Sequence, residues 1–244
     1  KQHLRQTHAI VSFSHAYMHR FLQQVDYPAD QAYIIPFPLD IDAYPARKSE
    51  PETPTLGFLS RLCPANGFDL LVEAFLRLHE DPRFRDVRLL ATGGIMKEDQ
   101  PFIERLRQRI GEHQLLSMFE IIPDFRLRDR IHFLSAISIL CVPVREPITF
   151  GSFMLEANAM GVPVLQPNLP PFVEYVEATK GGELFPANDV EALTEKLREL
   201  LLDSPRRKAL GAHSQEYVRS HFSLQAAGAA LVDVYHQIMT QTGY

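Results

Sequence analysis

Two places in the sequence put a charged side chain beside the expected start of a helix that follows a strand. In the first, SRLCPANGFDLL, Arg61 follows an apolar run, and a helix is expected to begin near Asn66 and Gly67. A guanidinium there could bind a diphosphate through paired hydrogen bonds, and the helix dipole would add to the attraction. An exposed arginine with Asn66 as an ordinary N-cap fits the spacing equally well. Both interpretations stay open.

The second place is REPITFGSFMLEANAMG, where a loop leads into a helix expected to begin near Gly151. Glu156 falls in the early turns of this helix, and its carboxylate could accept hydrogen bonds from the hydroxyls of a ribose. The alternative is a carboxylate that only complements the helix dipole. The sequence by itself favours neither.

Other motifs that could do chemistry are absent or badly placed. The sequence has no GxGxxG after a strand and no GxxxxGK[ST], which argues against Rossmann-type NAD use and P-loop nucleotide hydrolysis. Asp40 and Asp42 form a D-x-D in a proline-rich linker, where we expect no metal. His113 and His132 could lie near the ligand-binding end of the sheet, but no motif connects either of them to a reaction. Gly93 is expected to form a turn with positive φ.

The elements that must position these residues alternate regularly from residue 55 onward. Short apolar runs alternate with amphipathic stretches of helical period, the pattern of a parallel α/β sheet. We therefore expect one doubly wound, Rossmann-like domain over residues 54–221. The expected strands are Thr55–Ser60, Val87–Thr92, Met118–Ile122, Ile137–Val142, Val162–Leu165 and Gly182–Phe185.

The first 53 residues contain too few elements for a core of their own. They offer a strand from His8, a helix over Ser14–Val25, a strand from Ala32 and then a proline-rich linker. They are expected to be the trailing edge of a preceding α/β domain. The terminal helix, Leu224–Thr240 within residues 222–244, is expected to pack back on that edge. Its apolar face consists of Ala227, Leu231, Val234 and Ile238.

The composition of the chain argues against several classes of function. Of 244 residues, 45% are hydrophobic and 23% are charged, and the net charge of −5 argues against a nucleic-acid partner. Cys63 and Cys141 have no metal-binding spacing and suggest reduced thiols and a cytoplasmic location. No apolar run reaches the roughly 18 residues of a membrane span. The chain begins without Met and is expected to be a piece of something longer.

The order of these segments resembles the C-terminal, donor-binding half of a family 4 glycosyltransferase (glycosyl transferases group 1) with the GT-B fold. The family pattern GRL-x3-KG-x-D-x-L-x-x-A-F is matched from Ser60 to Phe75, and E-x-FG-x4-EA-x-A-x-G-x-PV is matched from Phe150 to Val164. The passage AYIIPFPLDIDAYP is similar to the family's interdomain passage VIPNGVD-x3-F. The tail GGELFPANDVEALTEKLREL, from Gly181, fits as well.

The resemblance implies a role for particular residues. Arg61 would pair with the diphosphate of the donor, Glu156 would hold the ribose of its nucleotide, and the backbone at Phe150 and Gly151 would approach the sugar phosphate. Asn66 stands where the family has a lysine on the diphosphate.

Two further departures lie in the loops of this site. The first glutamate of the family's E-x7-E pair should stand at Ile148, but the nearest carboxylate, and the candidate catalytic residue, is Glu146, which makes the spacing E-x9-E. Pro170 and Pro171 replace a glycine-rich loop and remove two N–H donors.

The resemblance also implies a function, the retaining transfer of a sugar from a nucleoside-diphosphate donor to an unknown acceptor. The acceptor would be bound mainly by a preceding domain, which could also contact a membrane surface peripherally. No metal or other cofactor is expected. The alternative is a non-catalytic relative that acts as a binding or partner subunit, because Asn66, the displaced Glu146 and the Pro170–Pro171 pair have changed three parts of one anion site.

Overall fold

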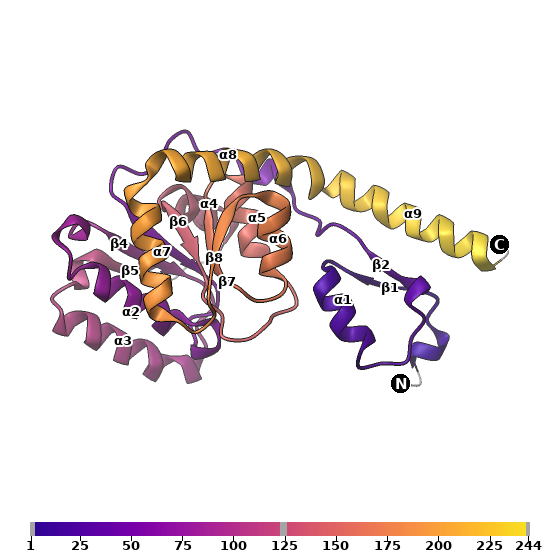
Figure 1. Ribbon diagram of the computed structural model, residues 1–244, viewed down its shortest axis with the longest axis horizontal. Coiled ribbons are helices and arrows are strands. Elements are labelled where there is room, and N and C mark those ends of the chain that lie inside the picture. Colours follow the sequence, from indigo (N-terminus) through magenta and orange to yellow (C-terminus); the bar gives the residue numbers. More distant parts are fainter. Residues whose placement is uncertain (1–2, 123–125, 243–244) are drawn as a thin grey trace.

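The structure, a computed structural model, describes residues 3–122 and 126–242 of the chain (Figure 1). Its larger part is a parallel sheet of six strands in the order β5-β4-β3-β6-β7-β8. This confirms the predicted Rossmann-like α/β class. The strands are β3 (Thr55–Leu59), β4 (Arg88–Thr92), β5 (Phe119–Ile122), β6 (Ile139–Cys141), β7 (Val164–Pro167) and β8 (Gly182–Phe185).

Helices cover both faces of this sheet. On one face α2, α3 and α7 pack together, and on the other α5 and α6 pack against α8. The helices of this part are α2 (Phe68–Leu78), α3 (Gln100–Glu112), α4 (Leu127–Ser135), α5 (Ser152–Ala159), α6 (Phe172–Thr179), α7 (Val190–Leu202) and α8 (Ser204–His221).

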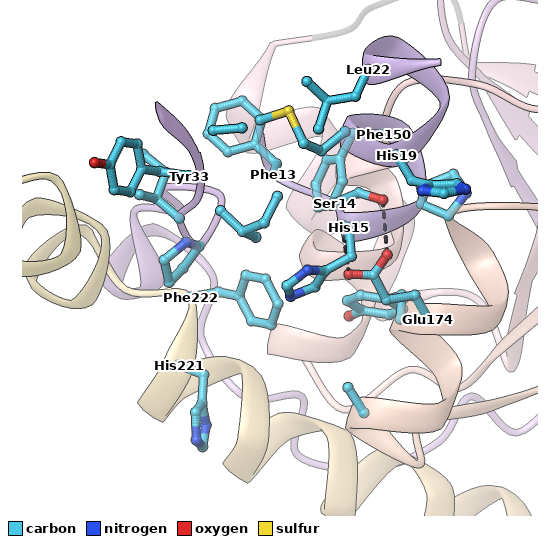
Figure 2. Close-up of a pocket in the computed structure, with 18 of the residues that line it drawn as sticks. Phe13, Ser14, His15, His19, Leu22, Tyr33, Phe150, Glu174, His221 and Phe222 are labelled. Carbon is cyan, nitrogen blue, oxygen red and sulfur yellow. Dashed lines mark hydrogen bonds between the residues drawn. The ribbon is translucent and has the colours of Figure 1, made fainter. Parts of the chain in front are cut away.

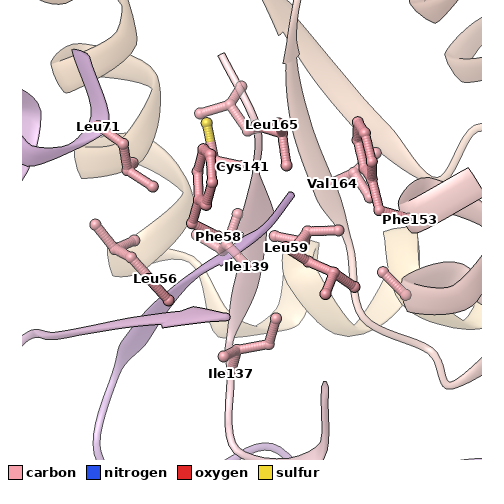
Figure 3. Close-up of a cluster of buried hydrophobic side chains, with 14 of the residues drawn as sticks. Leu56, Phe58, Leu59, Leu71, Ile137, Ile139, Cys141, Phe153, Val164 and Leu165 are labelled. Atoms are coloured by element: carbon pink, nitrogen blue, oxygen red, sulfur yellow. The ribbon is translucent and has the colours of Figure 1, made fainter. Parts of the chain in front are cut away.

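The core explains why the strands are apolar throughout. Every residue of β3 is buried, and side chains on alternate faces meet helices on opposite sides of the sheet. Figure 3 shows Phe58 of β3 together with Leu71 of α2, and Val164 of β7 together with Phe153 of α5. Burying a side chain of this size stabilises the fold by about 1.5–3 kcal/mol.

The strand order reverses between β3 and β6. The chain moves outward in one direction through β4 and β5, then returns to pair β6 with β3 and continues in the opposite direction. In open α/β sheets a ligand binds in the crevice outside the carboxyl ends of the strands at such a reversal. The residues that follow β3 and β6 are therefore the ones to consider for function.

A smaller unit lies beside the large sheet. In it β1 (Ile10–Ser12) and β2 (Ala32–Ile34) pair in parallel, separate from the six-stranded sheet, and α1 (His15–Leu22) connects them. Helix α9 (Leu224–Thr242) continues beyond α8 and extends to the same end of the molecule as β1 and β2 (Figure 1).

The expected apolar face of α9 is its least exposed face. Ala227 and Val234 are buried, and Leu231 and Ile238 are half-buried. The division of the chain at residues 53 and 221 stays a prediction, and residues 1, 2, 243 and 244 of the expected terminal units lie outside the described residues.

The passage after β2 is anchored on the larger part. Leu39, Ile41 and Tyr44 belong to the main hydrophobic core, and the Leu39 N–H donates to the carbonyl of Phe222 at 2.9 Å. Further along, the Glu50 carboxylate accepts a hydrogen bond from Arg207 Nε at 3.0 Å. Although proline keeps this passage out of a sheet, its apolar side chains fix it to the six-stranded domain.

Candidate functional site

The crevice between β3 and β6 is bordered by two tight segments. After β3 the chain makes a short turn, η4 (Pro64–Asn66), and then enters α2 through Gly67, which has φ of 71°. A Cβ atom at Gly67 would collide with the carbonyl oxygen of Pro143, which follows β6. Only glycine accommodates both this backbone conformation and this close approach. The two segments are thus in direct contact at the carboxyl edge of the sheet.

Arg61 projects from the end of β3 and is held by carboxylates. Its Nε donates to Asp99 Oδ2 at 2.8 Å, and its Nη2 donates to Asp99 Oδ1 at 3.0 Å and to Glu98 Oε1 at 2.9 Å. The hydrogen bonds with Arg61 lower the pKa of Asp99, and those with Asp99 raise the pKa of Arg61. The side chain of Arg61 is 39% exposed, so a ligand can reach it.

Asn66 is not the N-cap that one interpretation of the sequence required. Its Nδ2 donates to Ser60 Oγ at 2.9 Å and to the carbonyl of Arg61 at 2.9 Å. The N-cap position of α2 belongs to Gly67 instead, and no side chain caps that helix. The N-cap interpretation was wrong because the chain makes an extra turn before α2. Asn66 instead ties this turn to the end of β3.

Glu156 lies inside the protein, in the middle of α5. The Nη1 of Arg130, from α4, donates to its two carboxylate oxygens at 3.1 and 3.0 Å, and Tyr44 hydrogen-bonds to it as well. Burial raises the pKa of Glu156, against the opposing effects of Arg130 and the Tyr44 hydrogen bond. Only 8% of its side chain is exposed. Glu156 lies beyond the first turn of α5, so it does not serve mainly to complement the helix dipole.

Phe150 and Gly151 form the entrance to α5. Gly151 is the N-cap residue of α5. Because glycine has no side chain, it offers no acceptor to the first backbone N–H groups of this helix. Phe150 stacks on Phe37 of the passage after β2, with ring centroids 4.8 Å apart, and its ring centroid lies 6.1 Å from that of Phe13. The loop before α5 is therefore in contact with the chain that leads out of the smaller unit.

Glu146 occupies the exposed part of this same loop. Its neighbour Arg145 is fixed, since Nη2 pairs with Asp69 Oδ2 at 2.5 Å and Nε donates to the carbonyl of Pro64 at 3.1 Å. These two contacts anchor the loop after β6 to α2 and to the turn before it. The catalytic role expected for Glu146 stays a prediction.

Three arginines near the carboxyl edge of the sheet share one property that the sequence did not reveal. Arg61, Arg130 and Arg145 are each paired with a carboxylate, those of Asp99, Glu156 and Asp69 respectively. A diphosphate arriving at this edge must compete with carboxylates already bound to these guanidinium groups.

Pro171 precedes α6, and the first turn of that helix contains a glutamate that the sequence analysis did not single out. The carboxylate of Glu174 accepts hydrogen bonds from Ser14 Oγ at 2.9 Å, from the His15 N–H at 3.0 Å and from the Ala16 N–H at 3.1 Å. Figure 2 shows Glu174 and Ser14 at the edge of a cavity of about 830 Å³ between the smaller unit and the larger part.

The two candidate histidines lie away from this edge. His113 caps the C-terminus of α3, and His132 lies in the last turn of α4. Both helices end where the chain enters the amino end of the next strand, so the expectation that these histidines could lie at the ligand-binding end was wrong. Asp40 and Asp42 are exposed, and the described residues contain no cluster of three or more side chains arranged to hold a metal ion.

Two other expectations concern single features. Gly93 has φ of 146°, which confirms the expected turn after β4. Within residues 3–122 and 126–242, no helix combines the length and the apolar character needed to cross a membrane.

Sequence comparison finds relatives that transfer sugars. GDP-mannose-dependent alpha-(1-6)-phosphatidylinositol monomannoside mannosyltransferase of Mycobacterium tuberculosis is 25% identical over 252 residues, covering 92% of this chain and 60% of that protein. A GDP-mannose-dependent monoacylated alpha-(1-6)-phosphatidylinositol monomannoside mannosyltransferase of Corynebacterium glutamicum is 29% identical over 188 residues, covering 75% of this chain and 47% of that protein. The chain thus spans about half of the length of these relatives.

Solved structures share the fold. Sucrose-phosphate synthase from Thermosynechococcus elongatus superposes with a TM-score of 0.80 at 21% identity, over 96% of this chain and 59% of that one. The Anabaena protein HepE, in complex with UDP and glucose, superposes with a TM-score of 0.79 at 19% identity, over 97% of this chain and 63% of that one.

The family comparison covers most of the larger part. The model of glycosyl transferases group 1 matches residues 40–217, which include the whole six-stranded sheet and both segments that border its crevice. The chain therefore belongs to the glycosyl transferases group 1 family.

Proposed function

We propose that this chain is the C-terminal, donor-binding half of a family 4 glycosyltransferase. It would bind a nucleoside-diphosphate sugar and take part in transfer of the sugar, with retention of configuration, to an acceptor held mainly by a preceding domain. The observation that carries the proposal is the placement of Arg61 and the start of α5 on opposite sides of the crevice between β3 and β6.

The geometry suits a departing diphosphate. As the bond from the sugar to the diphosphate breaks, negative charge develops on the diphosphate. The N–H groups at the start of α5 and the Arg61 guanidinium are the groups that can stabilise this charge. Arg61 would exchange one or both carboxylate partners for phosphate oxygens. Glu156 would accept hydrogen bonds from the ribose hydroxyls while Arg130 holds it in place.

The loop before α5 would supply the remaining contacts. The backbone at Phe150 and Gly151 would approach the phosphate nearest the sugar, and Glu146, from the exposed part of the loop, would reach the sugar hydroxyls. We propose that no metal is required, since positive charge at this edge comes from arginines and a helix N-terminus. A cytoplasmic location, with the preceding domain in peripheral contact with a membrane, is proposed in the same way.

Titration calorimetry with UDP, GDP and ADP tests donor binding. We expect one of the three to bind with a dissociation constant below about 1 mM, and we expect Arg61→Ala to weaken that binding at least tenfold. Arg105→Ala, which changes an exposed arginine on α3, is the matched control and should leave the affinity unchanged. Absence of binding by all three nucleotides would refute the proposal.

A second function is favoured by a specific observation, the pairing of Arg61, Arg130 and Arg145 with carboxylates. With Asn66 in place of a lysine, such an edge fits a non-catalytic relative that acts as a binding or partner subunit. A donor hydrolysis and transfer assay on the full-length protein separates the two functions. Turnover that Arg61→Ala abolishes would exclude the non-catalytic role.

A further inference from the structure

The Glu174 carboxylate connects two parts of the chain that are about 160 residues apart. It lies in α6 of the larger part, and its donors, Ser14 Oγ and the N–H groups of His15 and Ala16, belong to the start of α1 in the smaller unit. We call these four residues the α1–α6 contact. Charge-assisted hydrogen bonds of this kind are stronger than bonds between neutral groups.

Two helix N-termini meet at this one carboxylate. Glu174 lies in the first turn of its own helix, and α1 begins at His15, directly after the N-cap residue Ser14. A negative charge is stabilised at the positive end of a helix dipole, and here the same charge lies near two such ends. Ser14, which is only 2% exposed, also accepts a hydrogen bond from the Tyr17 N–H. The contact therefore caps α1 while joining it to α6.

The packing around the contact leaves space. The adjacent cavity of about 830 Å³ is lined by His19 and Tyr33 from the smaller unit and by Phe150 and Phe222 from the larger part (Figure 2). Close packing does not fill this interface, so it cannot by itself fix the angle between the two parts. The α1–α6 contact and the stacking of Phe37 on Phe150 hold the two parts together at its border.

We propose that Glu174 is a positioning residue that sets the orientation of the smaller unit relative to the six-stranded domain. Strands β1 and β2 are parallel, and the residues after their carboxyl ends, Phe13 and Phe37, approach Phe150 beside the start of α5. The contact thereby keeps these strand ends directed toward the crevice. The presence of a sugar donor in the crevice rests on the proposed function. The orientation of the smaller unit does not depend on it.

The contact requires a carboxylate. Two backbone N–H groups and one hydroxyl donate to its two oxygens. In Glu174→Gln an amide NH2 would replace one oxygen, so a donor would face a donor and one N–H would lose its partner. Glu177, one turn further along α6 and exposed, offers a matched control in Glu177→Gln.

The distance between two spin labels reports the orientation. Cysteines introduced at Gln24 in the smaller unit and at Lys208 on α8, both exposed, carry the labels, while the native Cys63 and Cys141 are buried. We expect the unsubstituted chain and Glu177→Gln to share one narrow distance distribution. In Glu174→Gln and Glu174→Ala the distribution should shift and widen, roughly twofold, as further orientations become populated.

Two further measurements separate positioning from loss of structure. Circular dichroism should show that the helix content of the Glu174 variants is retained, and the affinity for the nucleotide that binds the unsubstituted chain should stay unchanged. Distance distributions that remain identical in both Glu174 variants would overturn the proposal. If the chain binds no nucleotide, the distances still decide the question, so failure of the proposed function is a separate result.

Discussion

Arg61 and Asp99 form a two-pronged ion pair at the carboxyl edge of the sheet, with Nε to Oδ2 at 2.8 Å and Nη2 to Oδ1 at 3.0 Å. The carboxylate is buried, with 4% of its side chain exposed, and also accepts a hydrogen bond from the Met96 N–H. A carboxylate in this position occupies the same fork of donors that a phosphate would use. The pair therefore bears directly on how strongly this edge binds an anion.

Removing the charge of Asp99 should strengthen nucleotide binding. In Asp99→Asn the guanidinium of Arg61 no longer faces a buried negative charge, so a diphosphate competes more easily. We expect the affinity for the bound nucleoside diphosphate to rise roughly threefold to tenfold, measured by calorimetry. Asp81→Asn, which removes a carboxylate paired with Arg83 at the surface, is the control. Weaker binding in Asp99→Asn would show that Asp99 supports the site and does not compete with the ligand.

The same substitution should change the pH dependence of stability. Hydrogen bonds from Arg61 lower the pKa of Asp99 below its ordinary value of 3.8. The ionised carboxylate thus stabilises the folded state above that value, and the contribution is lost as the pH falls through the lowered pKa. We expect the melting temperature of Asp99→Asn to lie below that of the unsubstituted chain at pH 7 and to approach it below about pH 4. Thermal unfolding followed by circular dichroism measures this, and a constant difference across the range would contradict it.

Restoring a lysine at position 66 should strengthen the anion site and weaken the fold. Asn66→Lys adds a cation near Arg61, which we expect to raise nucleotide affinity roughly tenfold to a hundredfold. The change also removes the hydrogen bonds to Ser60 Oγ and the Arg61 carbonyl, which should cost about 1–2 kcal/mol of stability.

Asn66→Ala separates these two effects of the lysine substitution. It loses the same hydrogen bonds but adds no charge, so its stability should fall and its affinity should not rise. Unchanged affinity in Asn66→Lys would leave Asn66 with a structural role alone.

Glu156 should distinguish ribose from deoxyribose. If its carboxylate accepts hydrogen bonds from the ribose hydroxyls, the unsubstituted chain should bind a ribonucleoside diphosphate roughly tenfold more tightly than its 2′-deoxy form. Glu156→Gln should reduce that ratio to near one. Glu146→Gln, in the exposed loop, should keep it. A preference that survives in Glu156→Gln would remove Glu156 from the ribose site.

The contact between the turn before α2 and the loop after β6 should depend on Gly67. In Gly67→Ala the new Cβ meets the Pro143 carbonyl while the residue keeps a positive φ, so we expect a loss of about 2–4 kcal/mol. Apart from the adjacent residues, no atom lies within 4 Å of the place where a Cβ atom would stand at Gly94. Gly94→Ala should therefore change the free energy of unfolding by less than about 0.5 kcal/mol. Denaturant unfolding compares the two, and equal effects would contradict this account.

The strands could be predicted because local pattern determines them. The predicted strand Gly182–Phe185 agrees with β8 at both ends, and the apolar run Thr55–Ser60 agrees with β3 to within one residue. Continuous apolar runs between helices of regular period leave few alternatives in a parallel sheet. The Asn66 cap could not be predicted correctly, since the extra turn depends on how closely Gly67 approaches Pro143, a contact made only in three dimensions.

The partners of the site residues could not be predicted at all. Asp99 follows Arg61 by 38 positions, Arg130 precedes Glu156 by 26, and Ser14 precedes Glu174 by 160. Sequence spacing shows which residues share one face of a helix. These pairs instead join different elements, and only the packing of those elements brings the two side chains together. The sequence therefore placed Arg61 after β3 and Glu156 in the helix after β6, as the structure has them, but it did not show the charges that face them.

The strand order also has a consequence for how the larger part folds. Strands β3, β4 and β5 are neighbours both in space and along the chain, as are β6, β7 and β8, so each trio can form from short right-handed crossovers. Pairing of β3 with β6 must instead close a loop of about 80 residues, which is slow because of its entropy cost. The crevice between β3 and β6 is therefore completed only by the strand pairing with the largest sequence separation in the sheet, whereas the rest of the sheet forms from strands closer along the chain.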